Sequence, residues 1–316
     1  MLLFKYVSNL EYILSSGYIR ATQLSALNDP LEVVYDHNGL EQLTREFDNF
    51  EASTVVNYIE ENKHKIGVIS FSESKDNLLM WAHYADNHKG GLIGFYFHEN
   101  SIIDDLFLLK NFFGKSVFDG KCVSVKYRKQ PLYKIDTFDR DYSDIYAQGE
   151  DRLLYEIFQQ KSDEWIYEKE YRIILKLEQA HRVIIDKEDI EKYKYNNIYW
   201  FKNLLENSSI IKNDFIEFIG DKLYIYLEKI ENEGDRLIFG GCFSSLAKDN
   251  QNIIFLFKIS TSKISVVSYG YRNENIKMCN IKDKYSYFEE FQADIDKKNY
   301  TLEFKKIICR ENGGIT

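Results

Sequence analysis

The sequence is poor in cysteine and proline, and it contains no long apolar run. Its four cysteines lie far apart and form no CxxC pair: Cys122, Cys242, Cys279 and Cys309. This spacing is typical of neither a zinc site nor a dense disulfide framework, so we expect free thiols in a reducing cytoplasm. With only two prolines, Pro30 and Pro131, we expect long helices and strands joined by loops that proline does not stiffen.

The missing apolar run bears on where the protein works. No stretch is long enough for a membrane-spanning helix. The apolar opening over residues 1–6 is too short for a secretory signal peptide, and Lys5 brings a charge too early. We therefore expect a cytoplasmic protein without a membrane partner. The net charge of −9 argues against holding nucleic acid by bulk charge, but it leaves a local basic surface open.

The chain does have enough apolar and aromatic material for a large core. Of its 316 residues, 44% are hydrophobic and 16% aromatic, which excludes an intrinsically disordered chain. No linker rich in proline, glycine or serine divides it. Strand and helix patterns alternate without a regular βαβ repeat, so the sequence predicts an α+β fold. We expect a core over residues 1–186 and a C-terminal elaboration over 187–316, packed on the core as one unit.

Periodicity and capping residues predict the local elements. Strands are expected over residues 2–6, 18–22, 65–72, 91–97, 123–127, 168–177, 236–241 and 263–269. Helices are expected from Asn9 to the glycine at 17, and over residues 38–62, 77–85, 144–161 and 250–257, with a charged helical stretch in the tail at 282–316.

One group of residues around 70–88 has a composition suited to a planar ligand. Ser70 and Ser72 end a predicted strand, and Trp81 and Tyr84 follow on a short helix. Hydroxyl groups beside flat aromatic faces suit a heterocycle that carries a ribose. The same aromatic pair, three residues apart, is also typical of a core contact. His83 and the histidine at 88 are five residues apart rather than the four that a helical zinc site needs, which disfavours a metal.

A second group lies near residue 170. In a strand, Glu168, Glu170 and Arg172 point to the same face because side chains alternate with period two. This face is either an exposed salt-bridged surface or an active-site carboxylate held by an arginine, and the pattern leaves both open. Asn28 and Asp29 precede a proline and are ordinary turn residues.

Taken in order, these motifs resemble the bacterial family known as domain of unknown function 2971. The motifs that carry the resemblance are the opening Leu-Phe-Lys-Tyr, Asn-Asp-Pro-Leu-Glu at 28–32, Ser-Phe-Ser at 70–72, Met-Trp-Ala-His-Tyr at 80–84, Asn-His-Lys-Gly-Gly at 87–91 and Trp-Ile-Tyr-Glu-Lys-Glu-Tyr-Arg at 165–172. The resemblance covers about the first 180 residues. The family name implies no activity.

More remotely, the order of elements is similar to the ADP-ribosyltransferase fold, particularly the DarT-type toxins that modify DNA. This resemblance implies a split β-sheet core and a catalytic glutamate before an aromatic residue, the place of Glu170. The chain departs from the pattern at its opening strand, where Lys5 and Tyr6 stand in place of the usual histidine or arginine. The mode of NAD binding is therefore expected to differ.

The resemblance implies a bacterial toxin or anti-phage effector that uses NAD as its substrate. ADP-ribose would pass to nucleic acid, to protein, or to water if the enzyme only destroys NAD, and an antitoxin or phage trigger would control it. Glu170 would be catalytic and Glu168 would activate the acceptor. The residues expected to bind NAD are Lys5, Tyr6, Asn28, Asp29, Ser70, Ser72, Trp81, His83, Tyr84 and Arg172.

Two other functions stay open. The chain can be a binding module that recognises a nucleotide or a partner without turnover. It can also be a metal-dependent nuclease that uses Glu168, Glu170 and a histidine, His83 or His88, a reading that the absence of a compact ligand motif disfavours.

Overall fold

The computed structural model describes residues 1–40, 52–97, 117–118, 120–130, 142–195, 214–274 and 288–307. Its strands are β1 Leu2–Val7, β2 Tyr18–Gln23, β3 Ile66–Ser72, β4 Gly91–Tyr96, β5 Cys122–Ser124, β6 Lys126–Arg128, β7 Gln160–Ser162, β8 Glu170–Lys176, β9 Arg182–Asp186, β10 Ile216–Ile219, β11 Lys222–Tyr226, β12 Ile254–Lys258, β13 Ile264–Tyr269, β14 Glu289–Asp296 and β15 Thr301–Lys306. Its helices are α1 Leu10–Ser16, α3 Ala52–Asn62, α4 Leu78–Tyr84, α5 Tyr142–Phe158, α6 Lys187–Tyr195 and α9 Glu233–Ser245.

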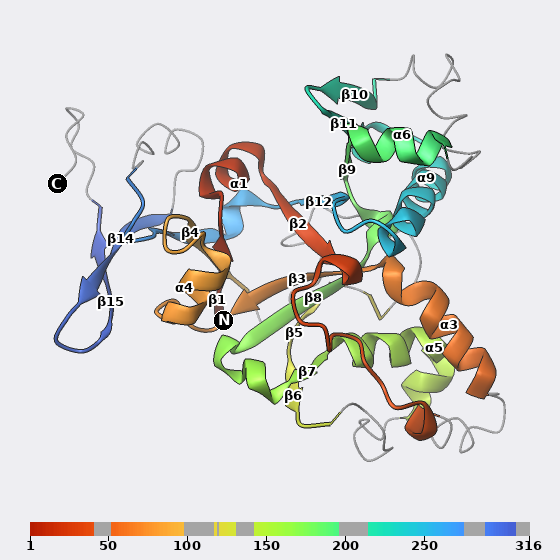
Figure 1. Cartoon of the computed structure of the whole chain (residues 1–316), viewed down its shortest axis with the longest axis horizontal. Coiled ribbons are helices and arrows are strands. Elements are labelled where there is room, and N and C mark those ends of the chain that lie inside the picture. The colour runs from red at the N-terminus through yellow and green to blue at the C-terminus, as the bar shows by residue number, and fades with distance from the viewer. Residues whose placement is uncertain are drawn as a thin grey trace.

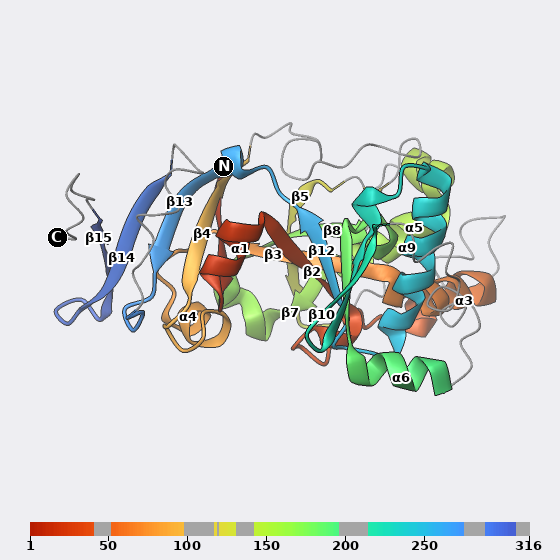
Figure 2. The ribbon, with the colours of Figure 1, turned by 90° about the horizontal axis from the view of Figure 1, so that it is seen from above.

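A long mixed sheet runs through the molecule. Its strand order is β10-β11-β9-β12-β2-β3-β1-β4-β13-β14-β15, and β8 pairs with both β3 and β5. Figures 1 and 2 show β14 and β15 at one end of the molecule, and α6 and α9 beside β9 and β11 at the other. The fold is therefore α+β, as the sequence predicts. Among the described residues, no helix combines the length and the apolar character needed to cross a membrane.

Strand β3 is the point at which the sheet divides. One edge of β3 pairs with β8 along its whole length, from Ile66 to Ser72. The opposite edge pairs with β2 only near its start, where Gly67 meets Gln23, and with β1 only at its end, where Ser72 meets Phe4. Strands β1 and β2 therefore diverge along β3, and side chains of all three strands face the space between them.

Two apolar clusters hold this arrangement. The larger packs both arms of the sheet, from Leu3 and Phe95 to Ile185 and Phe255, around α1 and α9. The smaller seats α3 and α5 against β3 and β8, with Ile59 and Phe158 fully buried. Burying such side chains stabilises the fold by about 1.5–3 kcal/mol each.

The first half of the chain follows the expectations closely. Helix α1 begins after Asn9, whose side chain accepts a hydrogen bond from the Tyr12 amide, and it ends at Gly17 in the left-handed conformation. The strands expected near residues 2, 18, 65 and 91 and the helices near 77 and 144 are all present. Of the helix expected over 38–62, residues 41–51 lie outside the described residues and Ala52–Asn62 is helical.

Several expectations for the second half were wrong. Residues 236–241 belong to helix α9 rather than a strand, and Gly240 lets this helix pack closely against the backbone of Glu178. A Cβ atom at Gly240 would lie 2.1 Å from the carbonyl oxygen of Glu178. The predicted helix at 250–257 is largely strand β12, and the described part of the tail forms the β14–β15 hairpin instead of a helix.

Several described strands after residue 187 are part of the main sheet. Strand β12 lies between β9 and β2, and β13 pairs with β4. The expected boundary at 186/187 therefore separates β9 from β11 and β12, two strands with which β9 pairs in the same sheet.

Candidate functional site

A cavity of about 340 Å³ opens where β1 and β2 diverge. Strands β1, β2, β3 and β8, helix α4 and the loop after β2 all contribute to its wall. Its lining residues are Phe4, Lys5, Tyr6, Arg20, Thr22, Ala26, Leu27, Asn28, Glu32, Ser70, Phe71, Met80, His83, Tyr84, Lys161, Glu168, Glu170 and Arg172. We call it the central cavity. Its size falls within the usual range of small-molecule sites, about 300–1,000 Å³.

Arg172 lies at the base of the central cavity, is 1% exposed and uses every N–H group it has. Its Nε and one terminal nitrogen donate to the two oxygens of Glu170, at 2.8 and 3.0 Å. Its terminal nitrogens also donate to both oxygens of Glu32, at 2.6 and 2.9 Å, and to the carbonyl of Phe158 at 2.8 Å. Arg172 therefore has no donor left for a ligand and acts by fixing two carboxylates.

Lys161 joins these carboxylates to a third. Its ammonium lies 2.6 Å from Glu168, 3.2 Å from Glu170 and 3.7 Å from Glu32. The five charged residues, which we call the charge cluster, are all nearly buried: Glu32, Lys161, Glu168, Glu170 and Arg172. Three carboxylates against two cations leave one negative charge when every group is ionised. Such a cluster is costly to bury, so it indicates either a specific fold requirement or a functional site.

The two carboxylates nearest each other in sequence have opposite pKa shifts. Burial raises the pKa of Glu168, and the charge of Glu170 adds to this effect against the opposing Lys161. Burial acts on Glu170 as well, but the charges of Arg172 and Lys161 outweigh it and lower its pKa to about 2. Glu170 therefore stays ionised, whereas Glu168 takes up and releases its proton at a higher pH than an ordinary glutamate does.

Two cationic residues, one on β1 and one on β2, line the same cavity as this anion. The Lys5 ammonium donates to the carbonyl oxygen of Ser70 at 3.0 Å, on the edge of β3 that β1 and β2 leave open. Burial lowers the pKa of Lys5 to about 8. Arg20 on β2 also lines the cavity, and among the described residues its buried Nε has no hydrogen-bond partner. One terminal nitrogen of Arg20 donates to the side chain of Gln23 and to the carbonyls of residues 251 and 253. Among the described residues that line the cavity, Lys5 and Arg20 are the lysine and arginine outside the charge cluster, and each keeps N–H groups for an anionic ligand.

The structure brings most of the residues expected from sequence into this one cavity. Those that line it are Lys5, Tyr6, Asn28, Ser70, His83, Tyr84, Glu168, Glu170 and Arg172. The Tyr84 hydroxyl donates to Glu168 at 2.6 Å and accepts from the Asn28 amide at 2.9 Å. Glu168 was expected on a strand, but it ends a 3-10 segment, Asp163–Glu168. Lys169 follows in the left-handed conformation, with φ of 46°, and the Glu168 side chain joins the charge cluster.

Three expected ligand-binding residues do not line the cavity. Trp81 is fully buried, packs edge-on against Tyr6 at 5.4 Å and donates its indole N–H to the carbonyl of Lys75. Its ring therefore stabilises the core beneath the cavity instead of stacking on a ligand from within it. Ser72 is fully buried and donates to the carbonyl of Glu168 at 2.6 Å, which positions that glutamate.

Asp29 is the third of these residues. One of its oxygens accepts a hydrogen bond from the backbone amide of Leu31, at 2.9 Å. Its other oxygen is buried without a hydrogen-bond partner among the described residues. Asp29 therefore shapes the turn that leads to Glu32.

The histidines do not form a metal site with the carboxylates. His83 is exposed at the rim of the central cavity, while His88 lies outside its lining and has its ring 4.9 Å from Tyr271. In the part of the chain that the structure describes, no group of three or more histidine, cysteine, aspartate or glutamate side chains is arranged to hold a metal ion. The carboxylates of the charge cluster have cations as their partners instead.

Sequence analysis missed three important residues of the cavity. Glu32 was noted only as part of a turn motif, and Arg20 and Lys161 were not selected at all. Glu32 and Arg172 are 140 positions apart in sequence and meet only because the loop after β2 folds over β8. Lys161 carried a weak signal, because it lies in the short polar stretch between α5 and the acidic segment at 163–168.

These observations define an α+β protein with a buried charge cluster in a divided sheet. Residues 80–173 match the model of a family described as a protein of unknown function (DUF2971). The matched range begins within α4, at Met80, and contains four residues of the charge cluster, Lys161, Glu168, Glu170 and Arg172. It confirms the resemblance to that family. The comparison with curated proteins gave no match, and neither did the comparison with solved structures.

Proposed function

We propose that this protein is an ADP-ribosyltransferase-like enzyme that cleaves NAD and transfers ADP-ribose to nucleic acid or protein, as a toxin or anti-phage effector. The observation that carries the proposal is the pair Glu168 and Glu170, two adjacent cavity carboxylates whose pKa values are shifted in opposite directions. Such a pair is typical of glycoside chemistry, in which one carboxylate stays ionised while the other moves a proton.

Glu170 has the properties needed next to a breaking glycosidic bond. When the bond from ribose to nicotinamide breaks, its electron pair goes to the pyridinium nitrogen and neutral nicotinamide leaves. The ribosyl group then develops the positive charge of an oxocarbenium ion. Because Arg172 and Lys161 keep Glu170 ionised and in place, its charge stabilises that cation without reorganisation.

The pyrophosphate of NAD needs cations that are not already neutralised. Arg172 does not qualify, because all its donors are used within the protein. Lys5 and Arg20 line the same cavity as Glu170, and in this proposal they bind the pyrophosphate. Lys5 would thus take the role for which the DarT-type toxins, to which the order of elements is similar, use histidine or arginine.

Glu168 then receives the proton of the acceptor. As the new bond from the ribosyl carbon to the acceptor atom forms, the acceptor loses its proton to the Glu168 carboxylate. Tyr84 and Lys161 hold the two oxygens of this carboxylate. The divergence of β1 and β2 around the cavity supports an ADP-ribosyltransferase-like split sheet as the framework for this chemistry.

The test is the release of nicotinamide from labelled NAD, with nucleic acid and cell extract supplied as acceptors. Glu170→Gln keeps the shape and removes the charge, so we expect loss of activity by about 100-fold or more. Glu156→Gln is the matched control, since Glu156 is equally buried and ion-paired, to Lys126 and Arg152, but does not line the cavity. Equal activity in both variants would contradict the mechanism.

A non-catalytic binding module is the second candidate, and one observation favours it. Both oxygens of Glu170 are occupied by Arg172, and such a saturated carboxylate is also typical of a structural ion pair. In that case Glu170→Gln captures the nucleotide or partner as well as wild type does, and wild type releases no nicotinamide. Binding then depends on Lys5 and Arg20, and substituting these residues abolishes capture.

A further inference from the structure

The wall of the central cavity holds two cations outside the charge cluster, and both are partly exposed. Among the described residues, the hydrogen-bond acceptors of Lys5 and Arg20 are backbone carbonyls and one amide side chain, with no carboxylate among them. Lys161, the other lysine of the lining, instead contacts three glutamates. Lys5 and Arg20 therefore differ from it in being available to a ligand.

Lys5 has the environment of a lysine that reacts as a neutral amine. Its nitrogen donates to the carbonyl oxygen of Ser70 at 3.0 Å and lies 5.8 Å from the ring of Phe71. Burial lowers the pKa of Lys5 to about 8; the charge of Glu170 opposes this effect and that of Arg20 adds to it. About a tenth of the Lys5 side chains are then uncharged at pH 7, against fewer than about one in a thousand for an ordinary lysine. A desolvated lysine next to another cation is typical of the amines that form imines with carbonyl compounds.

The rest of the lining fits a small phosphorylated molecule. One terminal nitrogen of Arg20 has no hydrogen bond among the described residues, and a guanidinium without a carboxylate partner suits a phosphate. The hydroxyl groups of Thr22 and Ser70 and the exposed amide of Asn28 line the same cavity and suit the hydroxyl groups of a sugar. The volume of about 340 Å³ accommodates a ligand of this size.

We propose that the central cavity captures a small phosphorylated aldehyde, whose phosphate binds Arg20 and whose carbonyl carbon condenses with the amine of Lys5 to an imine. The amine adds its electron pair to the carbonyl carbon, and one nitrogen proton passes to the carbonyl oxygen to give a carbinolamine. Protonated Glu168, which lines the same cavity, donates a proton to the new hydroxyl group, which leaves as water. The nitrogen electron pair closes the C=N bond, and the last nitrogen proton returns to Glu168.

This capture goes beyond the proposed function and does not require NAD cleavage. In the proposed function the ammonium form of Lys5 binds a pyrophosphate, whereas here its uncharged form reacts. ADP-ribose is the product when water is the acceptor, and it is itself a phosphorylated sugar with a free anomeric carbon. It is therefore expected to form the same imine once nicotinamide has left. This consequence alone rests on the proposed function.

The first experiment treats the full chain with glyceraldehyde 3-phosphate and sodium cyanoborohydride, which reduces an imine to a stable amine. Peptide mass spectrometry is expected to find one ligand, less one oxygen atom, on Lys5, at a rate that saturates with ligand concentration. Glyceraldehyde has the same aldehyde and no phosphate. At low concentration it is expected to label Lys5 about tenfold more slowly, since it lacks a charged hydrogen bond to Arg20.

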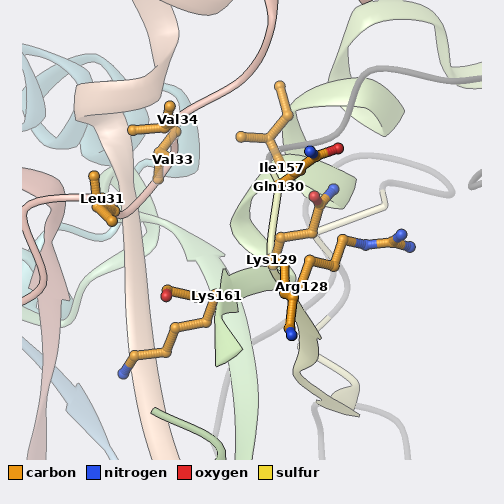
Figure 3. Close-up of a pocket in the computed structure, with 10 residues that line it drawn as sticks. Leu31, Val33, Val34, Arg128, Lys129, Gln130, Ile157 and Lys161 are labelled. Atoms are coloured by element: carbon orange, nitrogen blue, oxygen red, sulfur yellow. The ribbon is translucent and has the colours of Figure 1, made fainter. Parts of the chain in front are cut away.

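Three variants locate the two groups. Lys5→Arg keeps the positive charge and removes the amine, so label at position 5 is expected to disappear. Arg20→Gln is expected to react about tenfold more slowly with the phosphorylated aldehyde and nearly as fast as wild type with glyceraldehyde, which also shows that the cavity is folded. Arg128→Gln is the matched control, because Arg128 is also a partly exposed arginine but lines a smaller pocket of about 100 Å³. Figure 3 shows its guanidinium extending away from Leu31, which lines that pocket with it.

Four results would overturn the capture. They are label spread over exposed lysines without preference for Lys5, label on Lys161 instead, equal rates with and without the phosphate, and an Arg20→Gln variant that reacts as wild type does. Label that persists without the reductant would also overturn it, because an imine hydrolyses when the protein is denatured.

The second experiment separates this site from the proposed function. ADP-ribose, or NAD in its place, is incubated with wild type before the reductant is added, and both are expected to label Lys5. Label from ADP-ribose but not from NAD, without release of nicotinamide, would overturn the proposed function and leave the capture standing. Release of nicotinamide without label from ADP-ribose or glyceraldehyde 3-phosphate would overturn the capture and leave the proposed function standing.

Discussion

Glu168 and Glu170 share the ammonium of Lys161, at 2.6 and 3.2 Å, yet their pKa values move in opposite directions. The difference comes from Arg172, which binds both oxygens of Glu170 and neither of Glu168. A strand residue and a residue of the preceding 3-10 segment thus have different environments although they are two positions apart. This asymmetry separates a permanent anion from a titratable carboxylate, and the predictions below depend on it.

The low pKa of Glu170 predicts how acid affects stability. Its pKa falls from an ordinary 4.5 to about 2 on folding, so its contribution is complete above about pH 4.5 and disappears as the pH falls toward 2. This corresponds to at most about 3 kcal/mol of the free energy of unfolding. Urea unfolding between pH 5 and 3 is expected to show a steep loss for wild type and a shallower loss for Glu170→Gln. Parallel pH dependences would show that Glu170 is not held as an anion in the folded state.

Removing Arg172 is expected to destabilise the fold strongly. Arg172→Met leaves Glu32 and Glu170 buried with one cation, Lys161, and the expected cost is about 3–5 kcal/mol. The partly exposed pair of Arg182 and Glu228 provides the comparison, since Arg182→Met is expected to cost about 1 kcal/mol or less.

Chemical denaturation of both variants gives the two values. The double variant Glu32→Gln with Arg172→Met is expected to recover part of the loss, because one uncompensated carboxylate is removed. Similar values for the Arg172 and Arg182 variants would show that the charge cluster contributes no more than a surface ion pair.

The sequence predicted the part of this site that one strand supplies. Glu170 and Arg172 share a face because side chains alternate along β8, and Ser70 lies directly opposite Arg172 on β3. Glu32 could not be found this way, since its contact with Arg172 depends on how a loop packs after the sheet has formed. Local patterns carry no information about such a distant pair.

Glycines and aromatic residues misled the sequence analysis for a related reason. Residues 236–241 were predicted as a strand, but they lie in helix α9, where Gly240 lets the helix approach the backbone of Glu178. Tryptophan is a residue type that often stacks on ligands, but Trp81 lies in the core, where it packs against Tyr6 and Phe304. In both cases a neighbour from another part of the chain, absent from the local pattern, decides the role.

For the proposed role of Lys5 in binding NAD, its depressed pKa predicts that binding weakens in mild alkali. Burial lowers this pKa to about 8, so the ammonium loses its proton, and its attraction for a pyrophosphate, as the pH rises through 8. The KM for NAD is expected to rise about tenfold per pH unit above that value. Lys5→Arg should remove this dependence because a guanidinium stays protonated. A pH-independent KM in wild type, or the same rise in Lys5→Arg, would assign the binding to other groups.

The hydroxyl of Tyr84 is expected to tune Glu168 without contacting the reacting atoms. It donates to the Glu168 carboxylate at 2.6 Å and so stabilises the ionised form. Tyr84→Phe removes this hydrogen bond, worth about 1.5–3 kcal/mol to a charged group, and should raise the pKa of Glu168 further. The acid limb of the profile of kcat/KM against pH, measured for ADP-ribose transfer, is then expected to move to higher pH.

Tyr58→Phe is the control for this last prediction. Tyr58 also donates to a carboxylate, that of Asp151, but it belongs to the cluster around α3 and α5 and does not line the central cavity. Its loss should lower stability and leave the pH profile in place. If Tyr84→Phe lowers the rate equally at all pH values, Tyr84 only positions the substrate and Glu168 is not the group that accepts the proton. A shifted limb in Tyr84→Phe alone identifies Glu168 as that group, because no other carboxylate contacts the Tyr84 hydroxyl among the described residues.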